Sequence, residues 1–295
     1  MIITRLGGGM GNQMFQYALG RALSVKHNVP LGLDLTYLLE RVPRPAWKNF
    51  VFRNYDLGVF NISAKIVSRT EISFLYRPYF SGRLMLLFDA FRRKMFKLPG
   101  IEISYNFNQE TLSLNPNAYI SGRWQSPKYF SSIESIIRTD FTLKRPLSER
   151  AQKLKDEIRS ARSVCINVRR TDFVENSFHG TFGKEYYDKA IAMIAQSVSI
   201  TKIYVFSDDM AWCEENLHFN FPTMFVRHEY AGEKFEEYLM LMSACKHFII
   251  PNSSFAWWAA WLNTDKDKMV ITPKQWFPDL SKNTSDLIPS EWIRI

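Results

Sequence analysis

The chain has 295 residues, 46% of them hydrophobic and 15% aromatic, and it carries a formal net charge of +9. That length suits one large domain or two of about 130 to 150 residues each. The basic balance fits an anionic ligand, a nucleic acid or an anionic membrane surface, but no block of like charges is typical of a nucleic-acid tail.

Three cysteines, far apart and odd in number, exclude a disulfide framework and a zinc knuckle, because none forms a Cys-x-x-Cys pair. The N-terminal apolar run stops at Arg5, which is not typical of a signal peptide. No uncharged apolar run reaches the roughly 18 residues that a spanning helix needs. We therefore expect a cytoplasmic protein with, at most, peripheral contact with the inner face of a membrane.

The first predicted element is a strand over 2–6, joined by the glycine loop GGGMGN (7–12) to a helix over 13–27. A further strand is predicted over 29–35. Strand, glycine turn and helix are typical of the opening of a Rossmann-like unit. The loop lacks the third glycine of a dinucleotide fingerprint and the Gly-Lys-Ser/Thr of a P-loop, which counts against a dehydrogenase or an NTPase.

At the end of this loop, Asn12 and Gln13 can donate hydrogen bonds from their side-chain amides to a sugar or a phosphate. The glycines would let the backbone come close to such a ligand. The structural alternative is a plain turn in which Asn12 caps the helix.

Residues 40–120 show no clear pattern until a strand and turn within 118–130. The segment 73–100 mixes aromatic with basic residues and could form an amphipathic helix that contacts a membrane or an acceptor. Ordinary core helices with Arg and Lys on the solvent side explain the same pattern.

Beyond the Pro-containing, charged stretch at 142–150, strands and helices alternate regularly. Strands are predicted at 164–168, 202–206, 223–226, 247–250 and 268–272, and helices at 147–159, 185–198, from about 210, 233–245 and 254–262. This alternation predicts a parallel, doubly wound sheet. With a boundary near residue 140, we expect two Rossmann-like α/β domains, 1–140 and 141–295, facing across a cleft, and a last helix that packs back on the first domain.

Polar clusters follow three of these strands, at the edge where a parallel sheet binds its ligands. They are Arg169–Asp172, Ser207–Asp209 and Pro251–Ser254. Two adjacent guanidinium groups repel each other and lose hydration there, and an arriving anion would offset that cost. We expect one arginine to bind a phosphate and the other to pair with Asp172 or another carboxylate.

The last cluster begins a helix whose first turn offers unpaired N–H groups and two hydroxyls, which suits an anion. The alternative is that Asn252 or Ser253 merely caps the helix. Asp208 and Asp209 could bind a ribose hydroxyl or a base, or one of them could cap the helix that follows. No histidine shows metal-ligand spacing, and the Asp-x-Asp at 265–267 lies in a lysine-rich turn, so we expect no metal site.

Three stretches together resemble the bacterial α-1,2-fucosyltransferases of glycosyltransferase family 11. They are GGGMGNQMFQYALGRAL, NVRRTDF and SACKHFIIPNSSFAWWAAWLN, and the resemblance runs from residue 2 to about residue 277. It implies a GT-B fold and transfer of L-fucose from GDP-β-L-fucose, with inversion and without a metal or other cofactor. The acceptor it implies is the 2-hydroxyl of a terminal galactose, in an O-antigen or capsule unit, lipid-linked in some cases, or in a lactose-like sugar.

In the family motif His-x-Arg-Arg-x-Asp the second arginine binds the donor phosphate, which places that role on Arg170. The resemblance further implies that Ser253 and Ser254 hold the diphosphate and that Asn12 lies across the cleft near the fucose. The implied donor-binding set is Gly9, Gly11, Asn12, Asn167, Arg169, Arg170, Asp208, Glu237, Asn252, Ser253, Ser254 and Phe255, and the implied catalytic set is Arg170, Asp172 and Asn12.

The chain departs from the family at two positions. Asn167 stands where the family usually has a histidine that helps to hold guanine, and an amide can still donate and accept hydrogen bonds. The acid that reads guanine aligns with Tyr238, so we assign that role to the adjacent Glu237.

Transfer also requires a base for the acceptor hydroxyl and surfaces that bind the acceptor sugar. Candidate bases are Asp172, Glu175 and His179, and candidate stacking residues are Trp47, Tyr55 and Trp124. Two other classes of function stay open: a GDP-fucose-dependent enzyme that forms an α-1,6 or O-linked product, and a nucleic-acid-binding protein. Against the second stand the dispersed charge and the lack of any nucleic-acid-binding motif.

Overall fold

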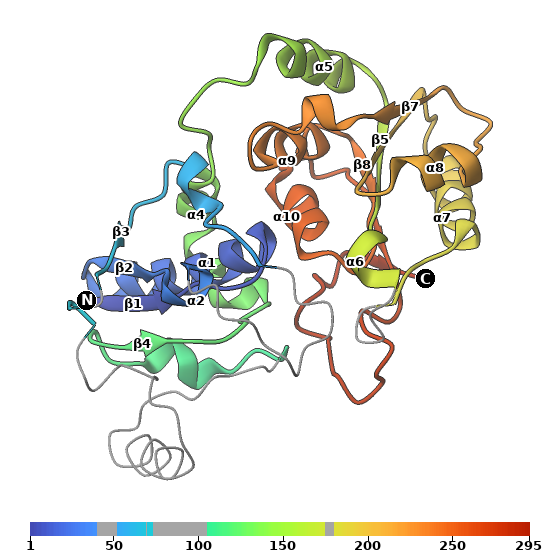
Figure 1. The fold of residues 1–295 in the computed structure, drawn as a ribbon. Coiled ribbons are helices and arrows are strands. Elements are labelled where there is room, and N and C mark those ends of the chain that lie inside the picture. Colours follow the sequence, from blue (N-terminus) through green and yellow to red (C-terminus); the bar gives the residue numbers. More distant parts are fainter. Residues whose placement is uncertain (40–51, 69, 73–104, 175–179) are drawn as a thin grey trace. The chain divides into compact units, whose positions relative to one another are not determined.

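The computed structural model describes residues 1–39, 52–68, 70–72, 105–174 and 180–295 (Figure 1). The chain divides into two compact units. Unit 1 comprises Met1–Thr142 with Ser285–Leu287, and unit 2 comprises Leu143–Thr284 with Ile288–Ile295. Segment 73–100 and Trp47, for which we suggested membrane or acceptor contacts, lie outside the described residues.

Unit 1 is built on a parallel sheet with the strand order β3-β2-β1-β4. Its strands are β1 (Ile2–Arg5), β2 (Leu31–Asp34), β3 (Lys65–Ile66) and β4 (Tyr119–Ile120), and its helices are α1 (Met10–His27), α2 (Thr36–Leu39) and α4 (Glu134–Asp140). Short 3₁₀ turns are η1 (Leu57–Val59), η3 (Gln109–Ser113), η4 (Pro127–Tyr129) and η5 (Ser131–Ile133). The order reverses between β1 and β4, so their carboxyl ends form the topological switch point of this unit.

Helix α1 begins three residues earlier than the sequence pattern suggests, so Met10, Gly11 and Asn12 are helical. Gly9 is the N-terminal cap, and its carbonyl accepts hydrogen bonds from the N–H groups of Asn12 and Gln13 at 3.0 and 3.1 Å. Burial of Met10 extends the apolar face of the helix by one turn. The alternative in which Asn12 caps the helix is therefore wrong.

Unit 2 contains a six-stranded parallel sheet with the order β10-β9-β8-β5-β6-β7. Its strands are β5 (Ser163–Val168), β6 (Lys202–Ser207), β7 (Thr223–Val226), β8 (His247–Ile249), β9 (Val270–Thr272) and β10 (Ile293–Arg294). This is the doubly wound Rossmann order, with its switch point between β5 and β8. The predicted α/β class with two Rossmann-like units, as the GT-B class has, is confirmed.

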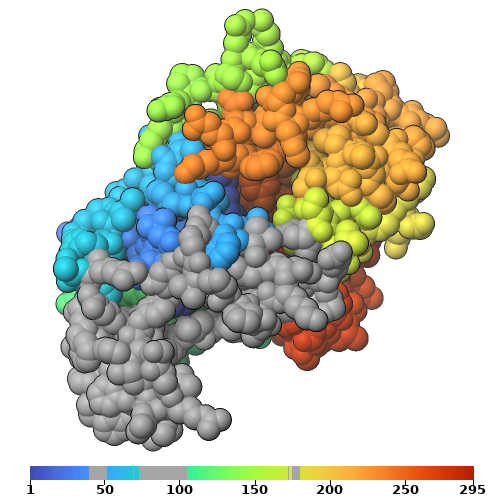
Figure 2. Space-filling model, viewed as in Figure 1, coloured from blue at the N-terminus to red at the C-terminus, as the bar shows by residue number. Residues whose placement is uncertain are grey.

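The helices of unit 2 follow the predicted pattern closely. They are α5 (Glu149–Ser160), α6 (Thr171–Val174), α7 (Lys184–Ser197), α8 (Met210–Asn216), the 3₁₀ turn η6 (His228–Tyr230), α9 (Glu236–Ser243) and α10 (Ser254–Leu262). α5 lies at the surface (Figure 2) and buries only Ala151, Leu154 and Ile158, which recur at helical spacing.

The end of the chain differs from the expectation of a last helix. No helix follows α10 in residues 263–295, all of which the structure describes. The chain instead adds β10 parallel to β9, and Ser285–Leu287 joins unit 1. Within unit 1, the Asp286 carboxylate accepts a hydrogen bond from the Phe107 N–H at 2.9 Å and from the Lys128 ammonium at 2.5 Å.

The core of unit 2 explains why its strands could be recognised in the sequence. All six residues of β5 are buried, and Val164, Ile166 and Ile194 belong to one apolar cluster with Val205. A strand buried on both faces is read as a continuous apolar run, and the polar residues after it mark where it ends. No helix among the described residues is both long and apolar enough to span a bilayer.

Candidate active site

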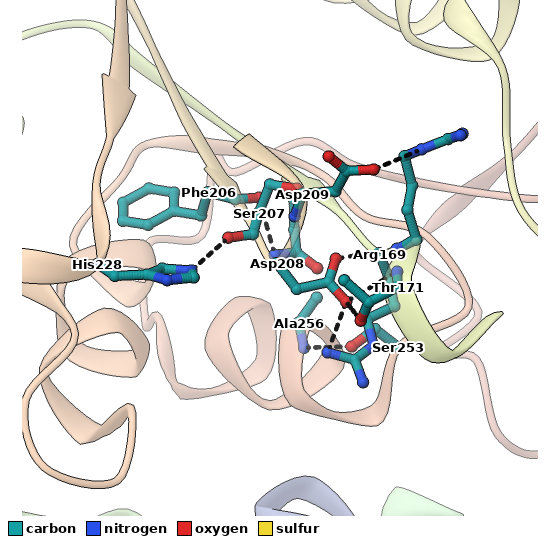
Figure 3. A network of polar contacts seen from close by, with 11 residues as sticks. Arg169, Thr171, Phe206, Ser207, Asp208, Asp209, His228, Ser253 and Ala256 are labelled. Atoms are coloured by element: carbon teal, nitrogen blue, oxygen red, sulfur yellow. Dashed lines mark hydrogen bonds and ion pairs between the residues drawn. The ribbon is translucent and has the colours of Figure 1, made fainter. Parts of the chain in front are cut away.

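The candidate site of unit 2 lies at the switch point of its sheet (Figure 3). β5 and β8 are hydrogen-bonded neighbours, with Val164 opposite His247. The loop that carries Arg169 and Arg170 therefore lies beside the loop Pro251–Ser253 that leads into α10. The sequence placed these clusters at one sheet edge, and the structure brings them together.

Both arginines pair with the aspartates that follow the neighbouring strand. Arg169 Nη1 lies 2.9 Å from Asp208 Oδ2, and Arg170 Nε lies 3.2 Å from Asp209 Oδ2. The cause is strand register, because Val168 at the end of β5 lies opposite Ser207 at the end of β6. We expected one ion pair, and the structure has two. The side chain of Asp172, the partner that we named, is outside the described part of the chain.

Asp208 organises the arginine loop. Its carboxylate accepts hydrogen bonds from the backbone N–H groups of Arg170 and Thr171 at 2.9 and 3.2 Å, from the Thr171 hydroxyl, and from Arg169. Hydrogen bonds to a carboxylate are among the stronger ones in proteins. We therefore assign Asp208 to shaping the loop, where the sequence suggested contact with the ligand itself.

Arg170 is held along one edge and one face. Its guanidinium carbon lies 4.1 Å from the ring centroid of Trp212, within cation–π range. Asp209, which binds Nε, also caps α8, because its Oδ1 accepts the Trp212 N–H at 3.2 Å. Among the described residues no hydrogen bond uses the Nη groups of Arg170, so this end of the planar fork can bind an oxyanion.

The ionisable groups packed near the arginine loop, Cys213 and Tyr187, are buried and uncharged. Burial raises the pKa of the Cys213 thiol on α8 to about 11, and it also raises the pKa of the Tyr187 hydroxyl. The Tyr187 hydroxyl donates to the Asn167 carbonyl at 3.4 Å. The charges of the arginines are thus balanced by the two aspartates and not by groups under the loop.

The start of α10 combines a cap with unpaired donors. Ser253 is the N-terminal cap, and its hydroxyl accepts the Ala256 N–H at 3.4 Å. The capping alternative is therefore correct for Ser253. Ser254 and Phe255 are half-buried, and no hydrogen bond within the described residues uses their N–H groups. Such N–H groups at a helix N-terminus suit a phosphate.

The two positions assigned to guanine are engaged within the protein. Asn167 is buried and donates from Nδ2 to the Phe206 carbonyl at 3.2 Å. The Glu237 carboxylate accepts from the N–H and the hydroxyl of Ser148, at 2.6 and 2.9 Å, where Ser148 caps α5. Tyr238 donates its hydroxyl to the Val226 carbonyl. These contacts give Glu237 a structural role at the start of α5, and its contact with guanine stays a prediction.

The glycine loop of unit 1 is clamped by α1. Gln16 accepts the Gly7 N–H and donates to the Gly122 carbonyl, both at 2.9 Å, which links the loops after β1 and β4. Gln13 is fully buried and donates to the Gly8 and Asn54 carbonyls at 2.9 and 2.8 Å. The expectation that Gln13 donates to a ligand is therefore wrong.

The predicted glycines of this loop differ in surroundings. Gly9 has open space where a Cβ would stand, whereas Gly11 is buried within α1. A Cβ on Gly8, whose φ is +77°, would lie 2.5 Å from the Asn12 side-chain nitrogen. Asn12 itself is half-buried, and Gln125 Nε2 donates to its Oδ1 at 2.5 Å.

Trp124 is a core residue and not a surface for a sugar. It is 2% exposed, and its ring meets Tyr129 edge-on at 5.8 Å between centroids. Its φ of 53° lies in the left-handed region, which costs a non-glycine residue on the order of 1–3 kcal/mol. Tyr55 is half-buried. Glu175 and His179 lie outside the described ranges.

Sequence reasoning missed Trp212 and Gln125. Trp212 follows Asp209 by three residues at the start of a helix, a spacing that places both near the same strand end. Gln125 follows β4 as the arginines follow β5, so reading strand ends in the first half of the chain would have found it. In the Asp-x-Asp turn, Asp265 accepts a hydrogen bond from the Asp267 N–H at 3.0 Å. Among the described residues no three His, Cys, Asp or Glu side chains form a group that could hold a metal.

A model of glycosyl transferase family 11 matches residues 88–295. The chain is 32% identical to an Escherichia coli protein named alpha-1,2-colitosyltransferase, over 100% of this chain and 99% of that protein. It is 31% identical to the O-antigen biosynthesis glycosyltransferase WbnK of Escherichia coli, over 98% and 99%. It is 25% identical to the galactoside 2-alpha-L-fucosyltransferase of Caenorhabditis elegans, over 60% of this chain and 52% of that protein. The chain therefore belongs to glycosyltransferase family 11 and is a glycosyltransferase, as its three motifs implied.

Proposed function

We propose that this enzyme transfers L-fucose, with inversion, from GDP-β-L-fucose to the 2-hydroxyl of a terminal galactose. The observation that carries the proposal is the way in which the Arg170 guanidinium is held. Its Nε and one face are held by Asp209 and Trp212, and its Nη groups are left for a diphosphate. The helix N-terminus of α10 follows the neighbouring strand and adds N–H donors. The names of the relatives support the sugar class and the α-1,2 linkage.

In the proposed reaction, negative charge develops on GDP as the bond to the sugar breaks. Arg170 and the N–H groups of Ser254 and Phe255 would stabilise that charge, so the mechanism includes no metal and no other cofactor. The sugar passes through an oxocarbenium-like state, as in glycosidic chemistry generally. The acceptor hydroxyl must lose a proton, and Asp172 in α6 is our candidate base.

A second donor has a specific observation in its favour, because a full-length relative is named a colitosyltransferase. Colitose is L-fucose without the 3-hydroxyl, so the two donors differ by one polar group. If the site hydrogen-bonds that hydroxyl, kcat/KM for GDP-fucose should exceed kcat/KM for GDP-colitose by about 10⁴–10⁵. If the site merely has room for the hydroxyl, the two values should differ by about 10²-fold or less. The ratio of kcat/KM for the two GDP-sugars therefore decides the donor.

The acceptor that we propose is a galactose-terminated O-antigen or capsule unit, in keeping with the name of the O-antigen relative. If that unit is carried on lipid, the enzyme would work in the cytoplasm in peripheral contact with the inner membrane. An α-1,6 or O-linked product is the alternative within the same chemistry. Product linkage determined by NMR separates it from an α-1,2 product.

The central test is calorimetric titration of GDP in the presence of EDTA, with wild type, Arg170→Ala and the surface control Arg159→Ala. A charge-assisted hydrogen bond contributes about 1.5–3 kcal/mol, so Arg170→Ala should weaken GDP binding about 10- to 100-fold. Arg159 is exposed on α5, and its variant should bind as wild type does. Failure of the wild type to bind GDP, or unchanged binding by Arg170→Ala, would refute the proposal.

A further inference from the structure

We propose that Gln125 is a positioning residue that orients the side-chain amide of Asn12, so that its Nδ2 faces the reacting sugar-phosphate as a hydrogen-bond donor. The inference rests on the proposed function and on the prediction from the family resemblance that Asn12 binds the donor substrate. It is carried by one contact, because Gln125 Nε2 donates to Asn12 Oδ1 at 2.5 Å. In this structure the nitrogen of Gln125 meets the oxygen of Asn12, and that arrangement turns Asn12 Nδ2 away from Gln125.

The contact lies at the switch point of unit 1, where a parallel sheet binds its ligands. Gln125 comes from the loop after β4, and Asn12 comes from the first turn of α1, just after β1. Gln125 is buried, whereas Asn12 is half-buried. The buried amide of Gln125 thus supports the more exposed amide of Asn12, as a positioning residue would.

The opposite end of the Asn12 amide is accommodated by Gly8. A Cβ on Gly8 would lie 2.5 Å from Asn12 Nδ2, so a larger residue at position 8 would displace the nitrogen. No hydrogen bond within the described residues uses Nδ2. The donor end of Asn12 is therefore fixed in direction and still available to a ligand.

The loop that carries Gln125 is itself held under strain. Trp124 has a φ of 53° although it is not glycine, and its indole N–H is buried with no hydrogen-bond partner in the described structure. The Gly122 carbonyl accepts from Gln16, and the Ser126 N–H donates to the Trp124 carbonyl at 2.9 Å. Strained, over-determined backbone of this kind clusters where a side chain must be aimed.

The deciding variant is Gln125→Glu, which keeps the size of the side chain but can only accept. To keep the contact, Asn12 must turn Nδ2 toward Glu and hide its donor, so kcat should fall about 10- to 100-fold with a small change in donor KM. Asn12→Asp keeps the contact to Gln125 but lacks the donor, and its kcat should fall about 10²–10³-fold. The matched control is Gln109→Glu, at an exposed glutamine of unit 1, which should have wild-type kcat and melting temperature.

The experiment measures sugar transfer from GDP-fucose to a β-galactoside, together with melting temperature, for the full chain. In a double-mutant cycle, Asn12→Ala and Asn12→Ala combined with Gln125→Ala should have the same kcat, because Gln125 acts through Asn12. A kcat in the double variant that is clearly lower than that of Asn12→Ala would overturn the assignment. So would wild-type kcat in a folded Gln125→Glu protein.

A second readout does not depend on turnover. The side-chain NH₂ signal of Asn12 in ¹⁵N-labelled protein should shift in Gln125→Glu and not in Gln109→Glu. If the wild type transfers no sugar from GDP-fucose or GDP-colitose, the proposed function fails, and this signal alone then decides the orientation. An unchanged Asn12 signal in Gln125→Glu overturns the inference.

Discussion

Replacement of Trp212 by leucine tests whether Arg170 is held ready for its ligand. The ring contact at 4.1 Å and the 18% exposure of the Arg170 side chain favour one rotamer of that arginine. Without the ring, GDP must order the guanidinium when it binds, and immobilising one such side chain costs about 0.5–1.5 kcal/mol. The expected loss in GDP affinity is therefore about 2- to 10-fold, much smaller than the loss from removing Arg170 itself.

The assay is calorimetric titration of GDP into wild type, Trp212→Leu, Trp212→Phe and the double variant Arg170→Ala/Trp212→Leu. Trp212→Phe retains a ring and should bind within about 2-fold of wild type, since phenylalanine also makes cation–π contacts. In the absence of Arg170 the leucine variant should cause no further loss, because the ring acts through that side chain. A folded Trp212→Leu protein with wild-type affinity would refute the reasoning.

Three further predictions follow from named contacts. Glu237→Gln should lower the free energy of unfolding by about 2–3 kcal/mol, because hydrogen bonds to a carboxylate are lost. Its GDP affinity should stay at the wild-type value, and a selective loss of GDP affinity would restore the guanine contact. Gly8→Ala should destabilise the protein by about 1–2 kcal/mol and Gly9→Ala by less in thermal melts, because of the two only Gly8 has a positive φ and a close neighbour in Asn12. Equal melting temperatures would contradict this difference. Because burial raises the pKa of Cys213 from 9.0 to about 11, the native state retains a proton that the unfolded chain loses, so stability should fall as pH rises from about 9 toward 11. Urea midpoints should fall less with pH in Cys213→Ala, and an identical pH dependence in both proteins would exclude this contribution.

The sequence predicted the second half of the fold well because its elements are defined by local signals. Strand β7 and helix α10 have the predicted bounds, 223–226 and 254–262. Buried parallel strands are continuous apolar runs, and polar clusters end them. β10 was not predicted because it has only two residues, Ile293 and Arg294, which are too few to show a periodic pattern.

The candidate site was predicted in its location and less well in its contacts. The arginines, Asp208 and Ser253 were all placed at one sheet edge, which strand ends alone indicate. The partners of Glu237 and Gln13 could not be predicted because each side chain is engaged by a residue distant in sequence, Ser148 in one case and Asn54 in the other.

The amino-acid pattern was sufficient for the class of fold, the glycosyltransferase family and the sheet edge at which the polar clusters lie, since these depend on local periodicity and on motifs within one segment. Only the tertiary structure decided which polar group each side chain meets. Asp208 and Asp209 face the two arginines because β5 and β6 pair in a particular register. Gln125 faces Asn12 because the ends of β1 and β4 are neighbours. Strand register and strand order bring together residues that no sequence spacing relates, and the direction of each hydrogen bond follows from that placement.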